Sequence, residues 1–96
     1  MSTIEERVAR GAAWLDEHRP GWVTEIDLSI LLLADCCCCV IGQTFGCFAS
    51  GENPVDHDEA PEFGFNAADR AENWWEEQED LTAEWRRVIT ERRAAA

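Results

Sequence analysis

The sequence contains no lysine, and positive charge of any kind is scarce in it. Eight arginines stand against twenty aspartates and glutamates, which gives the 96-residue chain a formal net charge of −12. Such a charge repels phosphate backbones and anionic membranes, and it attracts basic protein surfaces. Because direct nucleic-acid binding normally requires a basic surface, this composition argues against nucleic acid as a direct partner.

The sequence also lacks an uninterrupted apolar run of the length that a membrane span requires. Residues 30–50 carry one charge, but Asp35 and Gln43 divide them into apolar pieces of about seven residues. A central aspartate costs roughly 2.5–3.5 kcal/mol on insertion scales, so we expect two short buried segments and no membrane span. Residues 1–10 are charged and have no apolar core, so we also expect no signal peptide and a cytoplasmic protein.

No disulfide framework of the secreted kind is present, and no catalytic motif is visible. Four of the five cysteines are consecutive, at positions 36–39, and the fifth is Cys47. Secreted frameworks use an even number of dispersed cysteines, so reduced cytoplasmic thiols fit better. The sequence contains no glycine-rich phosphate loop, no His-x-x-x-His pair and no nucleophile paired with a base. We therefore predict that the protein is not an enzyme.

What the sequence does contain is the pattern of a small, mostly α-helical domain. Its length suits one domain with a modest core, and 46% of its residues are apolar, with five tryptophans among them. A capping box at residues 2–5 predicts the start of the first helix, and Pro20 predicts its end. The apolar stripe of this helix consists of Ile4, Val8, Gly11 and Leu15, with Ala12 beside it.

The middle of the chain predicts a short helix followed by a buried one. Residues 22–26 follow a Pro-Gly turn and look helical, whereas residues 27–33 fit a buried strand or a helical turn equally well. Asp35 is a candidate N-cap for a helix that runs through Phe45 and ends at a glycine. Because residues 36–45 are apolar nearly all round, we expect this helix to be the central buried element.

The second half of the chain predicts a long acidic loop and then a long helix. Residues 49–66 contain two of the three prolines, and a loop of this length in a small domain is either disordered or functional. Asn66 can cap a helix over residues 68–93, with an acidic start and an arginine-rich end that suit the helix dipole. We therefore expect one domain over residues 1–96, with three to four helices around the buried helix, loop 49–66 outside and residues 94–96 as a tail.

A series of short motifs runs through most of the chain. They are Trp14-Leu-Asp16, Pro20-Gly-Trp22, Ile26-Asp-Leu28, Cys36-x-x-Cys39-Val-x-Gly-Gln-x-Phe-Gly46, Gly64-Phe-Asn66 and Leu81-Thr-Ala-x-Trp85. In this arrangement the chain resembles a family of small uncharacterised proteins from actinobacteria and their bacteriophages. The resemblance implies an intracellular, phage-encoded protein and brings no established activity with it. The residues Cys37 and Cys38 and the acidic loop are peculiar to this sequence.

The negative charge is concentrated in one segment. Residues 52–80 carry eleven acids and one arginine, a net charge of −10, whereas residues 81–96 carry +2. Trp74 and Trp75 lie in this segment about 100° apart around a helix, so both cannot easily face one core. Carboxylates could steer a basic partner while an exposed tryptophan anchors it. The candidate partner-binding residues are Asp56, Asp58, Glu59, Glu62, Trp74, Trp75, Glu76 and Glu77. The alternative interpretation is a solvated surface that only keeps the protein soluble.

Cys36-x-x-Cys39 is the sharpest chemical feature of the sequence. A tetrahedral zinc site would need two more ligands, for which Cys47 and His57 are the candidates, although the spacing matches no standard finger. A redox pair near a helix start is a second interpretation. The third is that the thiols only pack, as buried cysteines often do. His57 has an equally plain interpretation as a solvated side chain between two aspartates.

Two function hypotheses of different classes follow from these patterns. The first is a small acidic accessory protein of the phage type, without a cofactor, that binds a host protein with a basic surface; mimicry of DNA is one specific version. The second is a small structural zinc domain built on Cys36, Cys39, Cys47 and His57. A homodimer is compatible with both, because pairing would bury apolar surface that a small core leaves exposed.

Overall fold

The computed structural model describes residues 3–33, 35, 38–46, 59–67 and 74–95, and its regular elements are helices. Within these ranges the α-helices are α1 (Ile4–His18), α2 (Trp22–Glu25), α3 (Val40–Phe45) and α4 (Trp74–Ala95), and the 3₁₀ helix η2 (Ala60–Phe63) precedes α4. The described residues contain no β-strand. The prediction of a small, mostly α-helical domain is therefore confirmed.

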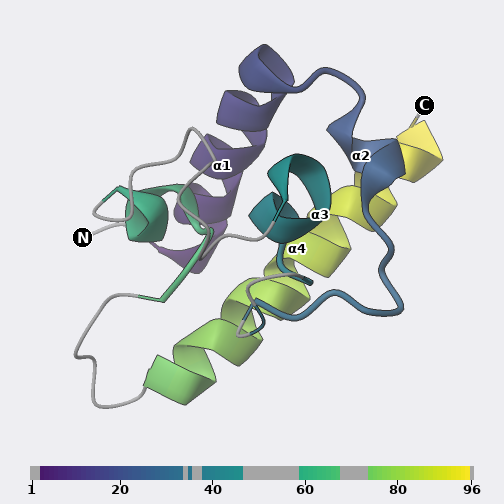
Figure 1. Ribbon diagram of the computed structural model, residues 1–96. Coiled ribbons are helices and arrows are strands. Elements are labelled where there is room, and N and C mark those ends of the chain that lie inside the picture. The colour runs from purple at the N-terminus through teal and green to yellow at the C-terminus, as the bar shows by residue number, and fades with distance from the viewer. Residues whose placement is uncertain (1–2, 34, 36–37, 47–58, 68–73, 96) are drawn as a thin grey trace.

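The two long helices, α1 and α4, form the frame of the domain (Figure 1). α1 packs against α4 and against η2, whereas the short α2 packs against α4 and against α3. In Figure 1 α4 runs diagonally below α1, and α2 lies beside the C-terminal end of α4. None of the helices in the described ranges has the length and apolar character that crossing a membrane requires.

α1 begins at a different cap from the one that the sequence predicted. The N-cap is Thr3, whose hydroxyl accepts a 3.1 Å hydrogen bond from the Glu6 N–H. Thr3 and Glu6 have the same spacing and chemistry as the expected pair at residues 2 and 5, shifted by one residue toward the C-terminus. The sequence therefore allows two positions for the same cap. Ser2, the expected cap, lies outside the described residues. Of the predicted apolar stripe, Val8, Gly11 and Leu15 are buried together with the adjacent Ala12, and Ile4 is partly buried against the core. The predicted stripe is therefore confirmed.

The connection from α1 to α2 follows the Pro-Gly turn. α1 ends at His18, before Pro20, and Gly21 precedes α2 with a φ of 86°, in the left-handed region that glycine adopts without strain. The indole N–H of Trp22 then donates a 3.0 Å hydrogen bond to Asp16. This contact joins the start of α2 to the end of α1, and the predicted short helix is confirmed.

Residues 27–33 form neither a regular strand nor a helix. Residues 28–30 make a turn that the Ile30 N–H closes on the Asp27 carbonyl oxygen at 3.3 Å. Leu31 and Leu33 are buried, and the Leu33 N–H donates to the Thr82 hydroxyl of α4 at 3.2 Å. The segment is therefore fixed by its contacts with α4 rather than by the regular backbone hydrogen bonds of a helix or a strand.

α3 is shorter than predicted because its N-cap is Cys39, not Asp35. The Cys39 thiol accepts a 3.2 Å hydrogen bond from the Gly42 N–H, which is a capping contact. Asp35 instead closes the preceding turn, where its carbonyl oxygen accepts from the Cys39 N–H at 2.9 Å. A run of identical apolar residues has no periodicity, so the sequence could not locate the start of this helix.

The end and the burial of α3 agree better with the prediction. The helix stops at Gly46, which has a φ of 102°. Three of its residues are buried, namely Val40, Ile41 and Thr44. The Thr44 hydroxyl donates to the Val40 carbonyl oxygen at 2.9 Å, so this polar side chain is satisfied inside the helix.

The prediction that the whole segment 49–66 lies outside the core is wrong for its last part. Ala60 and Phe65 are fully or almost fully buried, as is Ala67 directly after the segment, and η2 packs against α1. The acidic character of the segment concealed this, because its glutamates face solvent while its apolar residues face inward. Residues 47–58 lie outside the described residues. At the other end of the chain, α4 extends to Ala95, so two residues of the predicted tail are helical.

An aromatic cluster occupies the centre of the core. Trp85 of α4 stacks on Phe65, with ring centroids 5.6 Å apart, and meets the edge of Trp22 at 5.7 Å. Trp14, which lies off the predicted stripe of α1, contacts Phe65 and packs against the cluster, so it widens the buried face. Aromatic pairs in these geometries add stability beyond the area that they bury.

Candidate partner-binding surface

Apart from Cys39, which is described below, the predicted site residues fall into three groups in the structure. Asp56, Asp58, Cys36, Cys47 and His57 lie outside the described residues. Glu59 and Glu62 belong to the η2 region, and both are exposed. The other four predicted partner-binding residues, Trp74 to Glu77, form the first turn of α4 as described.

Two glycines bring the segment after η2 directly onto α1. A Cβ atom at Gly11 would lie 2.0 Å from the Phe63 carbonyl oxygen and 2.9 Å from the Trp85 ring. Gly64 has a φ of 69°, and a Cβ there would lie 3.0 Å from the Val8 nitrogen. Neither position has room for a side chain. The segment that connects to α4 is therefore fixed against α1 through backbone contact.

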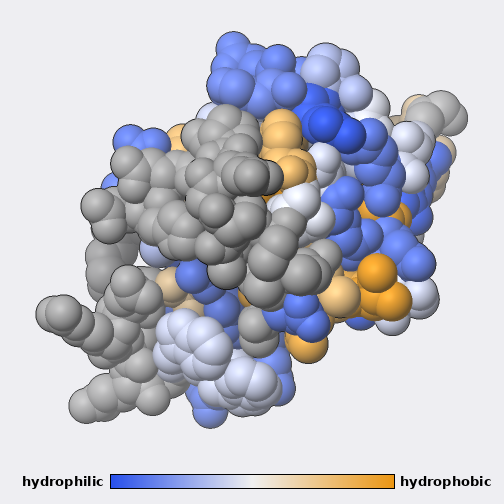
Figure 2. Space-filling view, in the orientation of Figure 1, coloured by the Kyte–Doolittle hydropathy of each residue, from blue (hydrophilic) through white to orange (hydrophobic). Residues whose placement is uncertain are grey.

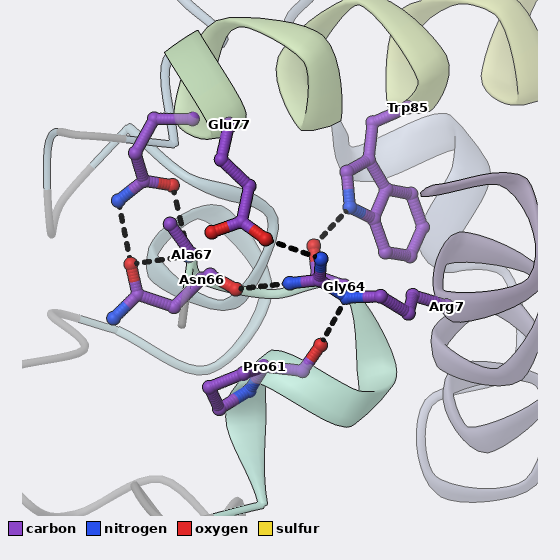
Figure 3. A network of polar contacts seen from close by, with 8 residues as sticks. Arg7, Pro61, Gly64, Asn66, Ala67, Glu77 and Trp85 are labelled. Atoms are coloured by element: carbon purple, nitrogen blue, oxygen red, sulfur yellow. Dashed lines mark hydrogen bonds and ion pairs between the residues drawn. The ribbon is translucent and has the colours of Figure 1, made fainter. Parts of the chain in front are cut away.

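Arg7 joins this segment to the start of α4 (Figure 3). Its guanidinium donates to the Pro61 carbonyl oxygen at 2.7 Å and to the Asn66 carbonyl oxygen at 3.1 Å. It also forms a 2.6 Å ion pair with Glu77, and the two side chains are only 11% and 18% exposed. Glu77 is thus part of the internal structure, and we remove it from the candidate surface.

Two further side chains of α4 complete the network around Arg7 (Figure 3). The Trp85 indole N–H donates to the Gly64 carbonyl oxygen at 2.6 Å. The Gln78 amide donates to the Asn66 side-chain oxygen at 2.5 Å and accepts from the Ala67 N–H at 3.2 Å. Asn66 was predicted to cap a helix over residues 68–93, and the predicted start of that helix lies outside the described residues. Within them, the Asn66 side chain binds Gln78. These contacts fix the face of α4 that points inward and so determine which face points outward.

Trp75 is the exposed member of the tryptophan pair. It is 57% exposed, whereas Trp74 is partly buried and lies against it with ring centroids 5.5 Å apart. The helical offset between neighbouring residues explains the difference, since the inward face is fixed by Gln78 and Trp85. The prediction that the two rings cannot share one core is confirmed.

Exposed carboxylates lie on α4 next to Trp75. Glu76, Glu79 and Asp80 are exposed, and none of them has a hydrogen-bond or ion-pair partner among the residues that the structure describes. The helix dipole favours acids in the first turn, which accounts for Glu76, but it decays before Glu79 and Asp80. We define the acidic α4 surface as Trp75, Glu76, Glu79 and Asp80. Sequence reasoning included Trp75 and Glu76 and missed Glu79 and Asp80, although their exposure follows from the helical period.

The structure also exposes two apolar side chains, Ile30 and Leu32, that were not predicted as surface residues. Ile30 and Leu32 are 50% and 46% exposed, whereas their neighbours Leu31 and Leu33 are buried. The alternation of buried and exposed residues was hidden because all four side chains are apolar. Figure 2 shows hydrophobic side chains gathered on the surface over the segment between α2 and α3.

The predicted zinc ligands are represented in the described residues by Cys39 alone. Its thiol is buried and caps α3, which is the packing and capping role of a small polar side chain. The part of the chain that the structure describes contains no group of three or more residues that could hold a metal ion. The other three candidate ligands, Cys36, Cys47 and His57, lie outside the described residues.

Comparisons of the chain with protein-family models, with curated proteins and with solved structures found no match. Its function is therefore proposed from the geometry and chemistry of its own residues.

Proposed function

We propose that the protein is a small acidic accessory protein of the phage type that binds a basic surface of a host protein through the acidic α4 surface. The observation that carries the proposal is Trp75, a large aromatic side chain that is 57% exposed on a rigid helix and is flanked by carboxylates. Tryptophan is enriched among the residues that dominate binding energy at protein interfaces.

The charge distribution supports a basic partner. The carboxylates of Glu76, Glu79 and Asp80 project from one short stretch of helix, and the chain as a whole carries −12. Complementary charge of this kind accelerates encounter and selects against acidic partners. Mimicry of the DNA backbone toward a host nucleic-acid-binding protein is one version of the proposal, since such a host protein presents the basic surface required.

The rigidity of the surface also supports binding. α4 is held to α1 by the Arg7–Glu77 ion pair and to the 64–67 segment by Trp85 and Gln78. A side chain on a helix that is fixed in this way loses little further freedom when a partner binds, which favours affinity.

Affinity capture from an actinobacterial lysate tests the proposal. The immobilised wild-type protein is compared with a triple variant of the surface, Glu76→Gln, Glu79→Gln and Asp80→Asn. The matched control carries the same charge change on the exposed face of α1, with Glu5→Gln, Glu6→Gln and Glu17→Gln.

The expected result is a basic protein retained by the wild type and by the α1 control but lost from the surface variant. Its retention should decrease between about 0.1 M and 1 M salt, where the Debye length falls from about 10 Å to about 3 Å. A partner that both triple variants retain equally, or that high salt does not affect, would contradict the proposed role of the acidic α4 surface.

A further inference from the structure

Large hydrophobic side chains are exposed both on the acidic α4 surface and on the segment between α2 and α3. Trp75, Ile30 and Leu32 are the large hydrophobic side chains that are about half exposed or more among the described residues. We call these three residues the apolar patch. Exposed apolar side chains that gather in one region, next to polar residues, are typical of interaction sites rather than of inert surface.

The three residues lie along one side of α4. The Arg86 guanidinium of α4 donates to the Leu31 carbonyl oxygen at 3.1 Å, and the Leu33 N–H donates to the Thr82 hydroxyl at 3.2 Å. Trp75 precedes Thr82 by seven residues, which places it on the same side of the helix and about 10.5 Å away along the axis. The segment that carries Ile30 and Leu32 therefore lies in line with Trp75, as its course past α4 in Figure 1 also indicates.

The backbone of this segment is already occupied. The Leu31 carbonyl oxygen is bonded to Arg86, the Leu32 N–H to the Cys38 carbonyl oxygen at 3.3 Å, and the Leu32 carbonyl oxygen to the Asp35 N–H at 3.1 Å. An extended peptide that adds to a strand edge needs free backbone groups. The patch instead offers side chains along one side of α4: the segment is bonded to Thr82 and to Arg86, which follow Trp75 by about 10.5 Å and about 16.5 Å along the axis, so one face of a second helix can follow it.

The charge around the patch differs between its two ends. Glu76 and Glu79 lie next to Trp75 at one end of the patch. At the other end, near Ile30 and Leu32, lie Arg86 and Asp27, which carry opposite charges. A second copy of this chain would bring like charges together across the patch, because each copy carries −12. A basic ligand removes that repulsion, so the charge favours a different partner over self-association.

We propose that the apolar patch is the docking site for a basic amphipathic helix of the partner. The apolar residues of that helix cover Ile30, Leu32 and Trp75, and its lysines or arginines face Glu76 and Glu79. This inference rests on the proposed function and adds to it the structure and the patterning of the segment that is recognised.

Two synthetic peptides of identical composition test the inference. The first, of about 18 residues, has leucines at i, i+3, i+4 and i+7 repeats with lysine and arginine elsewhere, so that it forms one apolar face. The second has the same residues in an order that distributes the leucines all round. Isothermal titration calorimetry measures the affinity of each for the full-length protein, and circular dichroism measures the helix gained on binding.

The expected result is that the amphipathic peptide binds at least tenfold more tightly than the scrambled one and becomes helical. Trp75→Ala and the double variant Ile30→Ser, Leu32→Ser should each weaken it about tenfold or more, whereas the α1 control Ala13→Ser should not. Circular dichroism of each variant alone checks that its fold is retained.

Three results would overturn the inference. Equal affinity for the two peptides would leave the acidic α4 surface as a purely electrostatic site, so the proposed function would survive without the helix. No affinity for either peptide would remove the docking site, and lysate capture would then decide the proposed function separately. Dimerisation in sedimentation experiments that Leu32→Ser abolishes would identify a second copy as the occupant.

Discussion

The two parts of α4 use their charged residues differently. In the C-terminal part, from Leu81 onward, each arginine is bonded to another group of the protein. Arg86 binds the Leu31 carbonyl oxygen, Arg87 binds Glu84 and Glu91, Arg92 binds Asp16, and Arg93 binds the carbonyl oxygens of Val23 and Ile26.

In the N-terminal part, Glu77 alone of the carboxylates is shown in an ion pair within the described residues, whereas Glu76, Glu79 and Asp80 face solvent. Trp85 is fully buried in the C-terminal part, while Trp75 is mostly exposed. The two parts of α4 therefore have different roles. Its second part joins the helix to the fold, and its first part leaves charge and an aromatic side chain available for a partner.

The largest expected effect distinguishes two of the three tryptophans of this helix, Trp85 and Trp75. Trp85→Ala should lower the free energy of unfolding by about 3–5 kcal/mol, because it removes a buried ring that packs on Phe65 and Trp22. Trp75→Ala should change it by less than about 1 kcal/mol, because most of that side chain is already in water. Urea denaturation measures both, and equal losses would contradict the assignment of the two parts.

The second effect concerns Glu77, the exception in the N-terminal part. Arg7→Ala should cost about 3 kcal/mol, because it removes the ion-pair partner of the poorly exposed Glu77 carboxylate and one donor from each of two carbonyl oxygens. Arg87→Ala is the control, since that arginine is exposed and its pairs with Glu84 and Glu91 are local to the helix. In chemical denaturation, the free energy of unfolding of Arg7→Ala should be far lower than that of Arg87→Ala. The reverse order would show that the network of Figure 3 contributes little to stability.

A third, smaller effect is a pH dependence at the C-terminal part. The hydrogen bond from Arg92 lowers the pKa of Asp16 from its ordinary 3.8, and the hydrogen bond from Trp22 adds to this. A lowered pKa stabilises the fold above pH 3.8 and ceases to do so as the pH falls through the lower folded-state value. Because the pair is half exposed, Asp16→Asn should cost less than about 1 kcal/mol at pH 7.

Thermal denaturation of wild type and Asp16→Asn between pH 7 and pH 2 measures this pH dependence. The difference in stability should decrease as the pH falls through the lowered folded-state pKa of Asp16, because the wild-type carboxyl takes up a proton there. A difference that does not decrease toward acid pH would show that the amide disturbs packing rather than charge.

The smallest expected effect on stability belongs to the acidic α4 surface itself. The triple variant Glu76→Gln, Glu79→Gln, Asp80→Asn should stay within about 0.5 kcal/mol of the wild type, since it removes like-charge repulsion at helical spacing. Loss of the fold in this variant, measured by circular dichroism, would mean that these carboxylates hold structure and are not free for a partner.

The sequence predicted the elements of the fold better than their ends. The stripe of α1, the stop at Pro20 and the exposure of one tryptophan follow directly from helical geometry and from proline. The start of α3 could not be predicted, because the cysteine run has no period and its cap is a thiol. The burial of residues 60–67 was missed for a different reason. Glu59 and Glu62 indicate an exposed segment, while the contacts with Gly11 and Arg7 that bury the apolar side of η2 come from distant parts of the chain.

The negative charge of the candidate site and its exposed tryptophan were predictable from the sequence. The segment 52–80 is visibly acidic, and the tryptophan pair is visible within it. The internal role of Glu77 depends on Arg7, seventy residues earlier in the chain, and the exposure of Ile30 and Leu32 depends on how the segment lies on α4. Such long-range contacts leave no local pattern in one sequence.

The most direct test of the central claim is the affinity of the captured partner for two variants with equal charge. The account predicts that neutralising Glu76, Glu79 and Asp80 weakens binding at least tenfold, while neutralising Glu5, Glu6 and Glu17 on α1 changes it less than twofold. Titration calorimetry at one fixed salt concentration measures both. Equal weakening by the two variants would show that the partner responds to the net charge of the protein, and that α4 carries no binding surface of its own.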